Sequence, residues 1–239
     1  MSVLTSKDNP KVKRWMKLAT DARFRRSENR ALIEGPHLIE AALQRGLKLL
    51  AVMATEQADT LGLKPTMVSR GVLRAIVDTD TPQGIVAEIG IPSVQAKGAT
   101  VFLEGIQDPG NVGAILRSAA AFGVGRVVLD QACADPWSPR ALRAAMGGHF
   151  ALGIVETKDL GAEINAFKGT VAVTVPRGGS KPQKADAWVF GAEGRGLSEH
   201  IMEKAKLKVT IPMAAGTESL NVAAAAAICL YESFSKSAG

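Results

Sequence analysis

The sequence predicts an α/β protein with a parallel sheet in its second part, and three observations support this prediction. From residue 100 onward, short apolar segments typical of buried strands alternate with helical segments. Glycine-containing turns directly follow three of these strands. The stretch 91–99 contains proline, serine and glycine, as boundaries between domains often do. We therefore expect a small mixed α/β domain over residues 1–98 and a parallel α/β domain over residues 99–239.

The first part is expected to contain both helices and strands. Apolar residues spaced by three and four predict helices over 9–20 and 27–45, and Gly46 is a suitable residue to end the second helix. A short strand over 47–55 follows. The segment 71–79 is expected to be a helix, and alternation of apolar residues predicts a strand at 84–90.

The second part has a regular rhythm of strand, loop and helix. Continuous apolar runs predict its strands, and segments rich in helix formers predict its helices, of which the last is strongly Ala-rich. The expected strands lie at 100–105, 126–130, 170–176, 187–194 and 208–213. The expected helices lie at 114–123, 138–150 and 219–237.

Composition excludes several classes of protein. The chain has 239 residues, 46% of them hydrophobic and 22% charged, which is ordinary for a globular fold and excludes wholesale disorder. Its longest apolar run, 222–230, is far shorter than a membrane span, and its charged start does not resemble a secretory signal. Two cysteines are too few for a disulfide framework or a metal cluster. We expect a cytoplasmic protein with no resident metal.

Positive charge is concentrated near the start of the chain. Residues 1–98 hold 15 basic and 10 acidic side chains, whereas residues 99–239 hold 14 and 13. Such a cluster is either a solvated helix face or a surface that attracts a phosphate backbone. Trp15 and Phe24 lie within it and are candidates for base stacking or for the core. The candidate RNA-binding side chains are Lys11, Lys13, Arg14, Arg23, Arg25 and Arg26.

Three segments at the ends of predicted strands carry polar side chains that could bind a ligand or take part in catalysis. In the first, 103–124, Asn111 either caps the following helix or contacts a ligand, and Arg117 lies two turns into that helix. In the second, 189–201, three glycines surround Glu193 on a loop that lacks the Lys-Ser or Lys-Thr of a Walker motif. In the third, 209–232, Ser219 and Asn221 either cap the last helix or orient a substrate.

Other catalytic patterns are missing from the sequence. It contains no G-x-S-x-G, H-E-x-x-H or C-x-x-C motif, and its three histidines are scattered. The turn Asp-Pro-Gly-Asn-Val-Gly at 108–113 departs from the G-x-G-x-x-G spacing of dinucleotide-binding sites. A nucleotide-dependent oxidoreductase is therefore a weak alternative.

Taken in order, the three segments resemble the signature motifs of the SpoU, or TrmH, family of RNA 2′-O-ribose methyltransferases, within the SPOUT class. The first match runs from Asn111 to Arg117, and the second is the run Gly-Ala-Glu-Gly-Arg-Gly-Leu at 191–197. The third comprises Ile-Pro at 211–212 and Ser-Leu-Asn-Val at 219–222. The resemblance spans nearly all of residues 100–235. After Val222 many relatives carry a serine where this chain has Ala223.

The resemblance implies a fold, a cofactor and a partner. It implies a parallel-sheet SPOUT domain whose C-terminal stretch forms a deep trefoil knot, with S-adenosylmethionine bound there, and a homodimer with its sites near the interface. Residues 1–98 are similar, more loosely, to the family's accessory RNA-binding domain, a small α/β module like a ribosomal protein. The substrate it implies is RNA, with ribosomal RNA favoured and transfer RNA second. A non-catalytic RNA-binding protein of the same fold is a further alternative.

The resemblance also implies roles for individual residues. Arg117 would be the general base, or would bind a phosphate and stabilise the developing alkoxide, and the second role suits the lasting positive charge of a guanidinium. Asn111 would orient the ribose or Arg117, and Glu193 would pair with Arg117. Ser219 and Asn221 would complete the catalytic pocket. The main chain at Gly191, Ile211 and Leu220 would hold the methyl donor.

Overall fold

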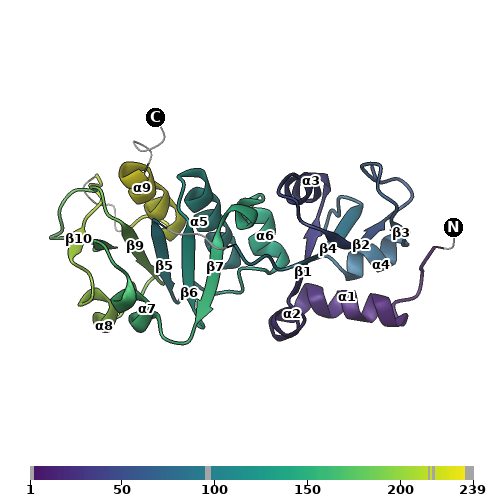
Figure 1. Cartoon of the computed structure of the whole chain (residues 1–239), viewed down its shortest axis with the longest axis horizontal. Coiled ribbons are helices and arrows are strands. Elements are labelled where there is room, and N and C mark those ends of the chain that lie inside the picture. Colours follow the sequence, from purple (N-terminus) through teal and green to yellow (C-terminus); the bar gives the residue numbers. More distant parts are fainter. Residues whose placement is uncertain (1–2, 95–97, 215, 217–218, 235–239) are drawn as a thin grey trace. The chain divides into compact units, whose positions relative to one another are not determined.

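The computed structural model describes residues 3–94, 98–214, 216 and 219–234. The chain forms two compact units (Figure 1). The first runs to Pro92 and also includes Asp135–Phe150, and the second comprises Ser93–Ala134 and the chain from Ala151 onward. A segment from the second half of the sequence thus packs as part of the first unit.

The first unit is built on a four-stranded mixed sheet in the order β1-β4-β2-β3. Strand β4 is antiparallel to both β1 and β2, whereas β3 is parallel to β2. The strands are β1 (Arg30–Glu34), β2 (Leu49–Ala54), β3 (Thr66–Met67) and β4 (Ile85–Gly90). The helices are α1 (Pro10–Thr20), α2 (Ala22–Glu28), α3 (Pro36–Gln44), α4 (Arg70–Ala75) and α6 (Pro139–Ala145).

A single helix over 27–45 was expected, and that expectation is wrong. Helix α2 ends at Glu28, and Asn29 takes the left-handed conformation that closes many helices, with φ 51°. Strand β1 follows, with residues 31–34 all buried. Gly35, with φ 91°, then precedes α3, which begins at Pro36 as helices commonly do. Apolar side chains on both faces of a strand imitate the helical spacing that the sequence suggested.

The core of the first unit joins α1 and α4 to one face of the sheet. Trp15 and Leu18 of α1 and Val72 of α4 are buried against Met53 and Val86 of the sheet. Helices α3 and α6 both pack against β1. The helix expected over 138–150 is in fact α6 and a short 3-10 turn, η1 (Gly148–Ala151), because Met146 and Gly147 both have positive φ.

The second unit contains a six-stranded, entirely parallel sheet in the order β10-β8-β9-β5-β6-β7. This confirms the predicted parallel α/β class. Its strands are β5 (Thr100–Glu104), β6 (Arg126–Asp130), β7 (Gly153–Thr157), β8 (Val171–Thr174), β9 (Ala187–Gly191) and β10 (Leu207–Val209). Its helices are α5 (Pro109–Ala121), α7 (Leu160–Ala166), α8 (Glu199–Met202) and α9 (Val222–Phe234). The sequence analysis missed β3, β7, α7 and α8, and it also missed α2 of the first unit.

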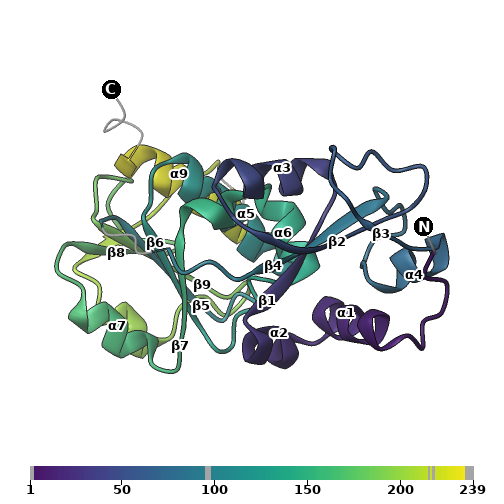
Figure 2. The ribbon, with the colours of Figure 1, turned by 45° about the vertical axis from the view of Figure 1, so that its right-hand side comes forward.

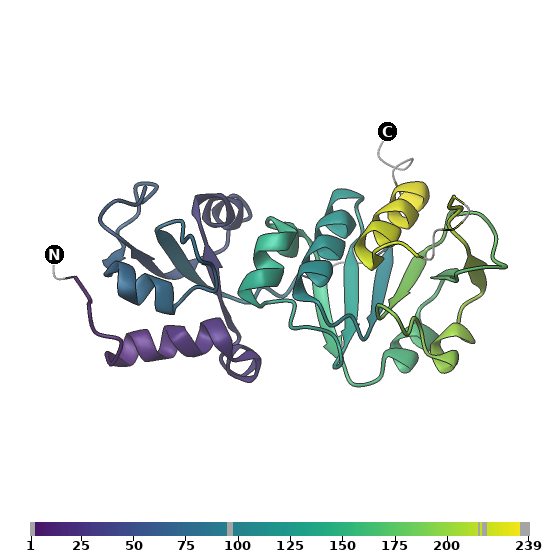
Figure 3. The same cartoon turned by 180° about the vertical axis from the view of Figure 1, so that it is seen from behind.

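Helices cover both faces of this sheet. Helices α5 and α9 pack against each other, and the Trp188 indole N–H donates to the Ser233 hydroxyl on α9 at 2.8 Å. The neighbouring residue Val189 points the other way, into a cluster with Leu160 of α7 and Ile201 of α8. Figures 2 and 3 show α5 and α9 side by side, with α7 across the sheet from them. In the described ranges, every helix is too short or too polar to cross a bilayer.

Candidate active site

A pocket of about 470 Å³ lies where β8, β9 and β10 end and α9 begins. Ligands of parallel α/β proteins bind at this edge of the sheet, beyond the carboxyl ends of the strands. The second and third sequence motifs form most of the lining. The pocket residues are Thr174, Val175, Pro176, Gly191, Ala192, Glu193, Gly194, Gly196, Leu197, Ile211, Met213, Ser219, Leu220, Asn221, Val222 and Ala225.

The glycine-rich loop after β9 turns back tightly on the strand. The Gly196 N–H donates to the Ala192 carbonyl at 2.8 Å and closes the turn. A Cβ at Gly191 would lie 2.5 Å from both the Gly196 carbonyl carbon and the Leu197 nitrogen. Only a residue without a side chain permits this approach of two backbone segments, so Gly191 shapes the pocket wall through its backbone.

Side chains from all three motifs meet in one hydrogen-bonded chain. The Asn111 amide donates to a carboxylate oxygen of Glu193. The Asn221 amide in turn donates to the Asn111 side-chain oxygen at 3.0 Å. Asn111 is 82 residues from Glu193 and 110 residues from Asn221 in the sequence. The fold therefore brings together three polar residues that the sequence analysis singled out separately.

The cap of α5 explains why Asn111 is available for this role. The Asp108 carboxylate accepts the Asn111 N–H at 2.9 Å, so Asp108 rather than Asn111 is the N-cap residue. The Asn111 side chain is therefore free to face Glu193. Asn221 both caps α9 and takes part in the pocket. Its side-chain oxygen accepts the Ala223 N–H at 2.9 Å, while its amide donates to Asn111.

The expected cofactor-binding positions Gly191, Ile211 and Leu220 all line the pocket, as do Glu193, Ser219 and Asn221. Asn111 joins them through its hydrogen bonds. Of the expected catalytic and cofactor-binding residues, only Arg117 neither lines the pocket nor joins this hydrogen-bonded chain.

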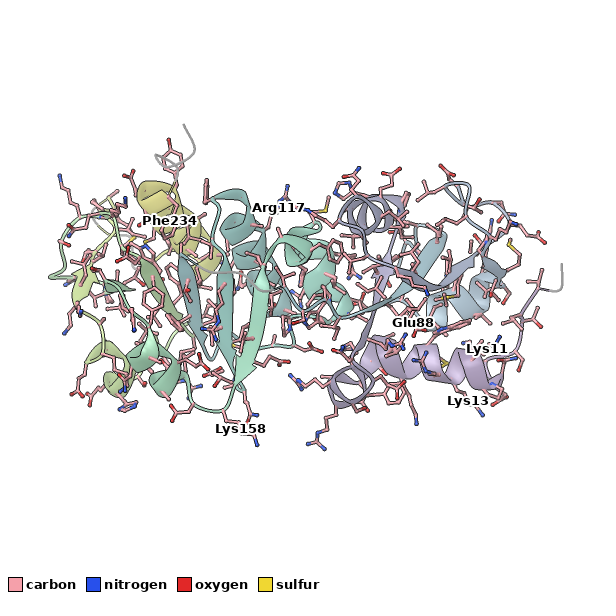
Figure 4. The ribbon with its side chains drawn as sticks, in the orientation of Figure 1. Lys11, Lys13, Glu88, Arg117, Lys158 and Phe234 are labelled. Carbon is pink, nitrogen blue, oxygen red and sulfur yellow. The ribbon has the colours of Figure 1, made fainter. Side chains whose placement is uncertain are left out.

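Arg117 is exposed on α5 and is not among the pocket-lining residues (Figure 4). Within the described ranges its side chain makes no hydrogen bond or ion pair, so it does not pair with Glu193 in this chain.

Two supporting residues, Glu104 and Thr210, were not singled out from the sequence. Glu104, at the end of β5, accepts both the Ser198 N–H at 2.8 Å and its hydroxyl at 2.6 Å, which anchors the start of α8. Thr210 accepts the Gly179 N–H at 2.9 Å and donates to the Val175 carbonyl at 3.1 Å. An acid directly at the end of a predicted strand was the signal that could have identified Glu104.

The two cysteines are not arranged as nucleophiles. Burial raises the pKa of the Cys133 thiol, and the neighbouring Asp130 carboxylate raises it further. Burial also raises the pKa of Cys229 to about 12. Both thiols are therefore protonated at neutral pH, and the thiolate is the reactive form.

The expected RNA-binding residues of the first unit fall into two groups. Lys11, Lys13 and Arg23 are exposed on α1 and α2, and Figure 4 shows the two lysines on α1. Arg26 is exposed as well. Lys13 forms an ion pair with Asp8 at 2.9 Å, in which both side chains are exposed. Arg14 is half-buried and forms ion pairs with Glu28 at 3.0 Å and with the buried Glu88 at 2.8 Å.

Arg25 is interior, which corrects its assignment to the RNA-binding face. Its side chain is only 4% exposed, and its guanidinium binds the Asp135 carboxylate at 2.6 Å and the Leu18 carbonyl at 2.6 Å. A buried cation that is already paired is not available to a phosphate. Trp15 is also a core residue, and its indole N–H donates to Glu88 at 3.1 Å.

Replacing Gly191 with alanine should cost ligand binding more than folding. The added methyl group forces the loop 192–197 away from β9, because the atoms it meets belong to the backbone. We expect affinity for S-adenosylmethionine, measured by calorimetry, to fall by about tenfold or more. Gly71→Ala is the matched control, since its methyl meets only the Ser69 hydroxyl oxygen at 3.8 Å. Normal binding by Gly191→Ala would contradict this account of the pocket wall.

Comparison with known proteins agrees with this geometry. Residues 98–231 match the model of the SpoU rRNA Methylase family. Residues 9–87 match the model of the MRM3-like substrate binding domain. The first match covers the parallel sheet, the pocket and the three motifs.

Individual relatives match over nearly the whole chain. A 23S rRNA (guanosine(2553)-2′-O)-methyltransferase, RlmP of Bacillus subtilis, is 33% identical over 97% of this chain and 98% of its own length. A crystal structure of an RNA 2′-O ribose methyltransferase has a TM-score of 0.81 at 30% identity, covering 97% of both chains. An AdoMet-bound rRNA methyltransferase from Sinorhizobium meliloti has a TM-score of 0.79 at 28% identity, covering 97% of this chain and 96% of its own. The chain described here belongs to the SpoU rRNA methylase family.

Proposed function

We propose that this protein transfers a methyl group from S-adenosylmethionine to a ribose 2′-hydroxyl of RNA, and that the RNA is ribosomal. The observation that carries the proposal is the pocket at the strand ends, where Glu193, Asn111 and Asn221 form one hydrogen-bonded chain. Membership of the SpoU family supports the reaction class. The name of the Bacillus subtilis relative makes 23S rRNA the first substrate to test.

The pocket fits S-adenosylmethionine in size and chemistry. Its volume of about 470 Å³ lies within the range of small-molecule sites. Apolar side chains of Ile211, Met213 and Leu220 suit the adenine ring, and main-chain groups at Gly191 and along 192–197 suit its polar edge. When bound, this cofactor supplies a methyl group on a sulfonium sulfur, ready for in-line displacement.

The chain's own side chains are proposed to position the ribose and to assist loss of its proton. A ribose 2′-hydroxyl is a weak nucleophile, so it must be held in line with the methyl group and must lose its proton. Asn111 and Asn221 are proposed to hold the ribose, with Glu193 fixing the Asn111 amide. Ser219 offers a hydroxyl at the pocket lining. A fixed set of donors lowers the barrier because the donors need not reorganise during the reaction.

Arg117 is proposed either to accept the 2′-hydroxyl proton as general base, or to bind the adjacent phosphate and stabilise the developing alkoxide while solvent takes the proton. Because it lies outside the pocket of its own chain, a second copy of the chain would have to supply it. This supports the homodimer implied by the family resemblance. Helix α9 next to the pocket exposes Ile228 by 37% and Tyr231 by 55%, and apolar side chains of this size suit a contact between copies.

The first unit is proposed to bind the RNA substrate. Its exposed cations Lys11, Lys13, Arg23 and Arg26 would contact phosphates, and the matched family model is that of a substrate-binding domain. Phosphate contacts of this kind weaken steeply as salt concentration rises. The division into a binding domain over 1–98 and a methyltransferase domain over 99–239 is part of the same proposal.

Two further parts of the proposal concern the fold and the location. The C-terminal stretch is proposed to form the deep trefoil knot of SPOUT proteins, and the first unit is proposed to share the fold of an RNA-binding ribosomal protein. Hydrogen bonds that join 175–180 to 208–210 draw together the segments that would form the knot. The site of action is proposed to be the cytoplasm, where ribosomal RNA is available.

Methyl transfer in vitro tests the proposed reaction directly. Purified protein is incubated with S-adenosylmethionine labelled in its methyl group and with 23S rRNA or bulk transfer RNA, and the RNA is digested to nucleosides. We expect label in a 2′-O-methyl nucleoside from rRNA. Label confined to tRNA would replace the proposed substrate, and label on a base would refute the proposed reaction.

A further inference from the structure

The first unit contains a second cleft, separate from the methyltransferase pocket. It has a volume of about 410 Å³ and lies among the loop after β2, helix α4 and the loop before β4. Most of its lining side chains are polar. The lining residues are Thr55, Gln57, Ala58, Arg70, Leu73, Arg74, Asp80, Thr81, Pro82, Gln83 and Gly84. None of the residues singled out from the sequence as RNA-binding belongs to this set.

The wall formed by residues 80–84 is held in place from inside the unit. The Gln83 N–H donates to the carboxylate of Glu34 at 3.2 Å, and the Glu34 side chain is only 6% exposed. The Thr55 N–H donates to the Gly84 carbonyl at 2.9 Å. A Cβ at Gly84 would lie 2.9 Å from the Ala58 Cβ, so the loops after β2 and before β4 are in close contact. Hydrogen bonds and close packing within the unit therefore hold this wall of the cleft in place.

Two arginines line one side of the cleft. Arg70 and Arg74 lie four residues apart on α4, which places them on the same helix face. Arg70 donates to the neutral Gln57 side chain at 3.1 Å. Arg74 has no hydrogen bond or ion pair within the described ranges. Unlike Arg14 and Arg25, neither guanidinium is paired with a carboxylate in that part of the chain. Each can therefore donate two parallel hydrogen bonds to a phosphate.

The other polar groups of the cleft indicate more than a simple anion site. Asp80 would repel a free anion, but it can accept a hydrogen bond from a base amino group or a ribose hydroxyl. Gln83 offers a donor and an acceptor, and Gln57, whose oxygen accepts from Arg70, offers the donors of its amide nitrogen. Groups of these kinds are used to read base edges. Proteins read such edges in RNA where nucleotides are unpaired, because the grooves of an RNA duplex expose them poorly.

We propose that this cleft binds an unpaired nucleotide of the substrate RNA, with Arg70 and Arg74 on its phosphate groups. Gln57, Asp80 and Gln83 contact the edge of its base. The inference rests on the proposed function, in which the substrate is RNA. It places the sequence-dependent contact of the first unit in this cleft and leaves the lysines of α1 to position the backbone.

Binding of labelled RNA to the full-length protein tests the proposal. The probes are a fluorescein-labelled single-stranded RNA of about twelve nucleotides and mixed sequence, and a duplex of the same length. The variant Arg70→Ala/Arg74→Ala should weaken binding of the single strand by about tenfold or more and lower the salt slope by about one or two. The matched control Arg45→Ala/Lys48→Ala removes two exposed charges of the same unit outside the cleft and should weaken binding by about threefold or less.

A second variant separates base reading from charge. Gln57→Ala/Gln83→Ala should weaken binding of the single strand with an unchanged salt slope and should leave duplex binding as it was. Equal losses of affinity for the single strand in Arg70→Ala/Arg74→Ala and in the control Arg45→Ala/Lys48→Ala would overturn the proposal. So would RNA binding that is unaffected by Arg70→Ala/Arg74→Ala while binding of inorganic phosphate is lost, because the cleft would then be a site for small anions.

Failure of the cleft proposal can be distinguished from failure of the proposed methyl-transfer function. Affinity for S-adenosylmethionine, which is proposed to bind the other unit, should be unchanged in all three variants. Urea unfolding followed by the fluorescence of Trp15 and Trp137 verifies that the first unit of each variant is folded. Protein that binds single-stranded RNA through the cleft but transfers no methyl group would refute the proposed reaction alone. Protein that methylates RNA equally well with or without the two cleft arginines would refute the cleft alone.

Discussion

Replacing Arg117 with alanine should lower methyl transfer by about 10²- to 10⁴-fold, the range of losses found when a proton-transfer group or a charge-stabilising donor is removed. The side chain is exposed on α5 and makes no hydrogen bond or ion pair in the described part of its own chain, so its loss should not destabilise the fold. Affinity for S-adenosylmethionine should be unchanged, because Arg117 does not line the pocket. Single-turnover transfer to rRNA measures the effect.

The variant Arg117→Lys distinguishes the two chemical roles. If Arg117 stabilises negative charge, lysine keeps the charge and should restore part of the activity lost in Arg117→Ala. If Arg117 removes the proton, Arg117→Lys should change the pH dependence of the rate, because a lysine ammonium ionises at lower pH than a guanidinium. Full activity of Arg117→Ala would remove this residue from the mechanism.

Mixing two inactive variants shows whether Arg117 acts across a dimer. Arg117→Ala keeps an intact pocket, and Glu193→Ala keeps Arg117. In a mixed dimer one site would regain both residues, so random mixing should restore about one quarter of wild-type activity. If Arg117 served the site of its own chain, the mixture would stay as inactive as either variant.

Replacing Arg25 with alanine should lower the free energy of unfolding of the first unit by about 3–5 kcal/mol. The guanidinium is 4% exposed, and the Asp135 carboxylate that it binds is 8% exposed. Its removal leaves a buried negative charge with its main partner gone, and the Leu18 carbonyl loses its donor as well. Urea unfolding followed by tryptophan fluorescence measures the loss, since Trp15 and Trp137 lie in this unit.

Arg23→Ala is the matched control for this prediction. Arg23 is exposed two residues away on the same helix, and its loss should change stability by about 0.5 kcal/mol or less. The two variants should behave oppositely toward RNA, because only Arg23→Ala removes a solvent-facing charge and lowers the salt slope of binding. Arg25→Ala with wild-type stability and weakened RNA binding would restore Arg25 to the RNA-binding face.

The local pattern of residues predicted the parallel sheet but not every element of the first unit. Strands such as 126–130 are continuous apolar runs between turns, and a parallel sheet buried on both faces produces that pattern. The segment 30–34 is also buried on both faces, but its apolar residues continue into α3 with helical spacing. The Gly35–Pro36 pair was the signal for a break, because glycine there takes a φ of 91° and proline begins the helix.

The site could be predicted as a set of residues but not as a geometry. Asn111, Glu193 and Asn221 stood out because each follows a predicted strand. Their mutual hydrogen bonds depend on the order of strands in the sheet, where β9 lies between β8 and β5, and local sequence does not encode that order. Within the chain Glu193 accepts a hydrogen bond from Asn111, and its expected pair with Arg117 stays a prediction for two copies of the chain.

Counting charges overestimated the RNA-binding face on α1 and α2. Arg14 and Arg25 belong to the basic cluster in the sequence, but both are paired with carboxylates that lie far along the chain, on Glu88 and Asp135. A local charge count cannot include such partners. Arg70 and Arg74 were not noticed because they stand apart from the cluster.

Ribose-methylation mapping of ribosomal and transfer RNA, from cells with and without this protein, tests the central claim most directly. The account predicts that one 2′-O-methyl site in ribosomal RNA disappears without the protein and returns when it is restored, but not when Arg117→Ala is supplied. Unchanged ribosomal RNA together with loss of a transfer RNA site would contradict the proposed substrate. Unchanged methylation at every ribose of both RNAs would contradict the claim that this protein is an RNA 2′-O-methyltransferase in the cell.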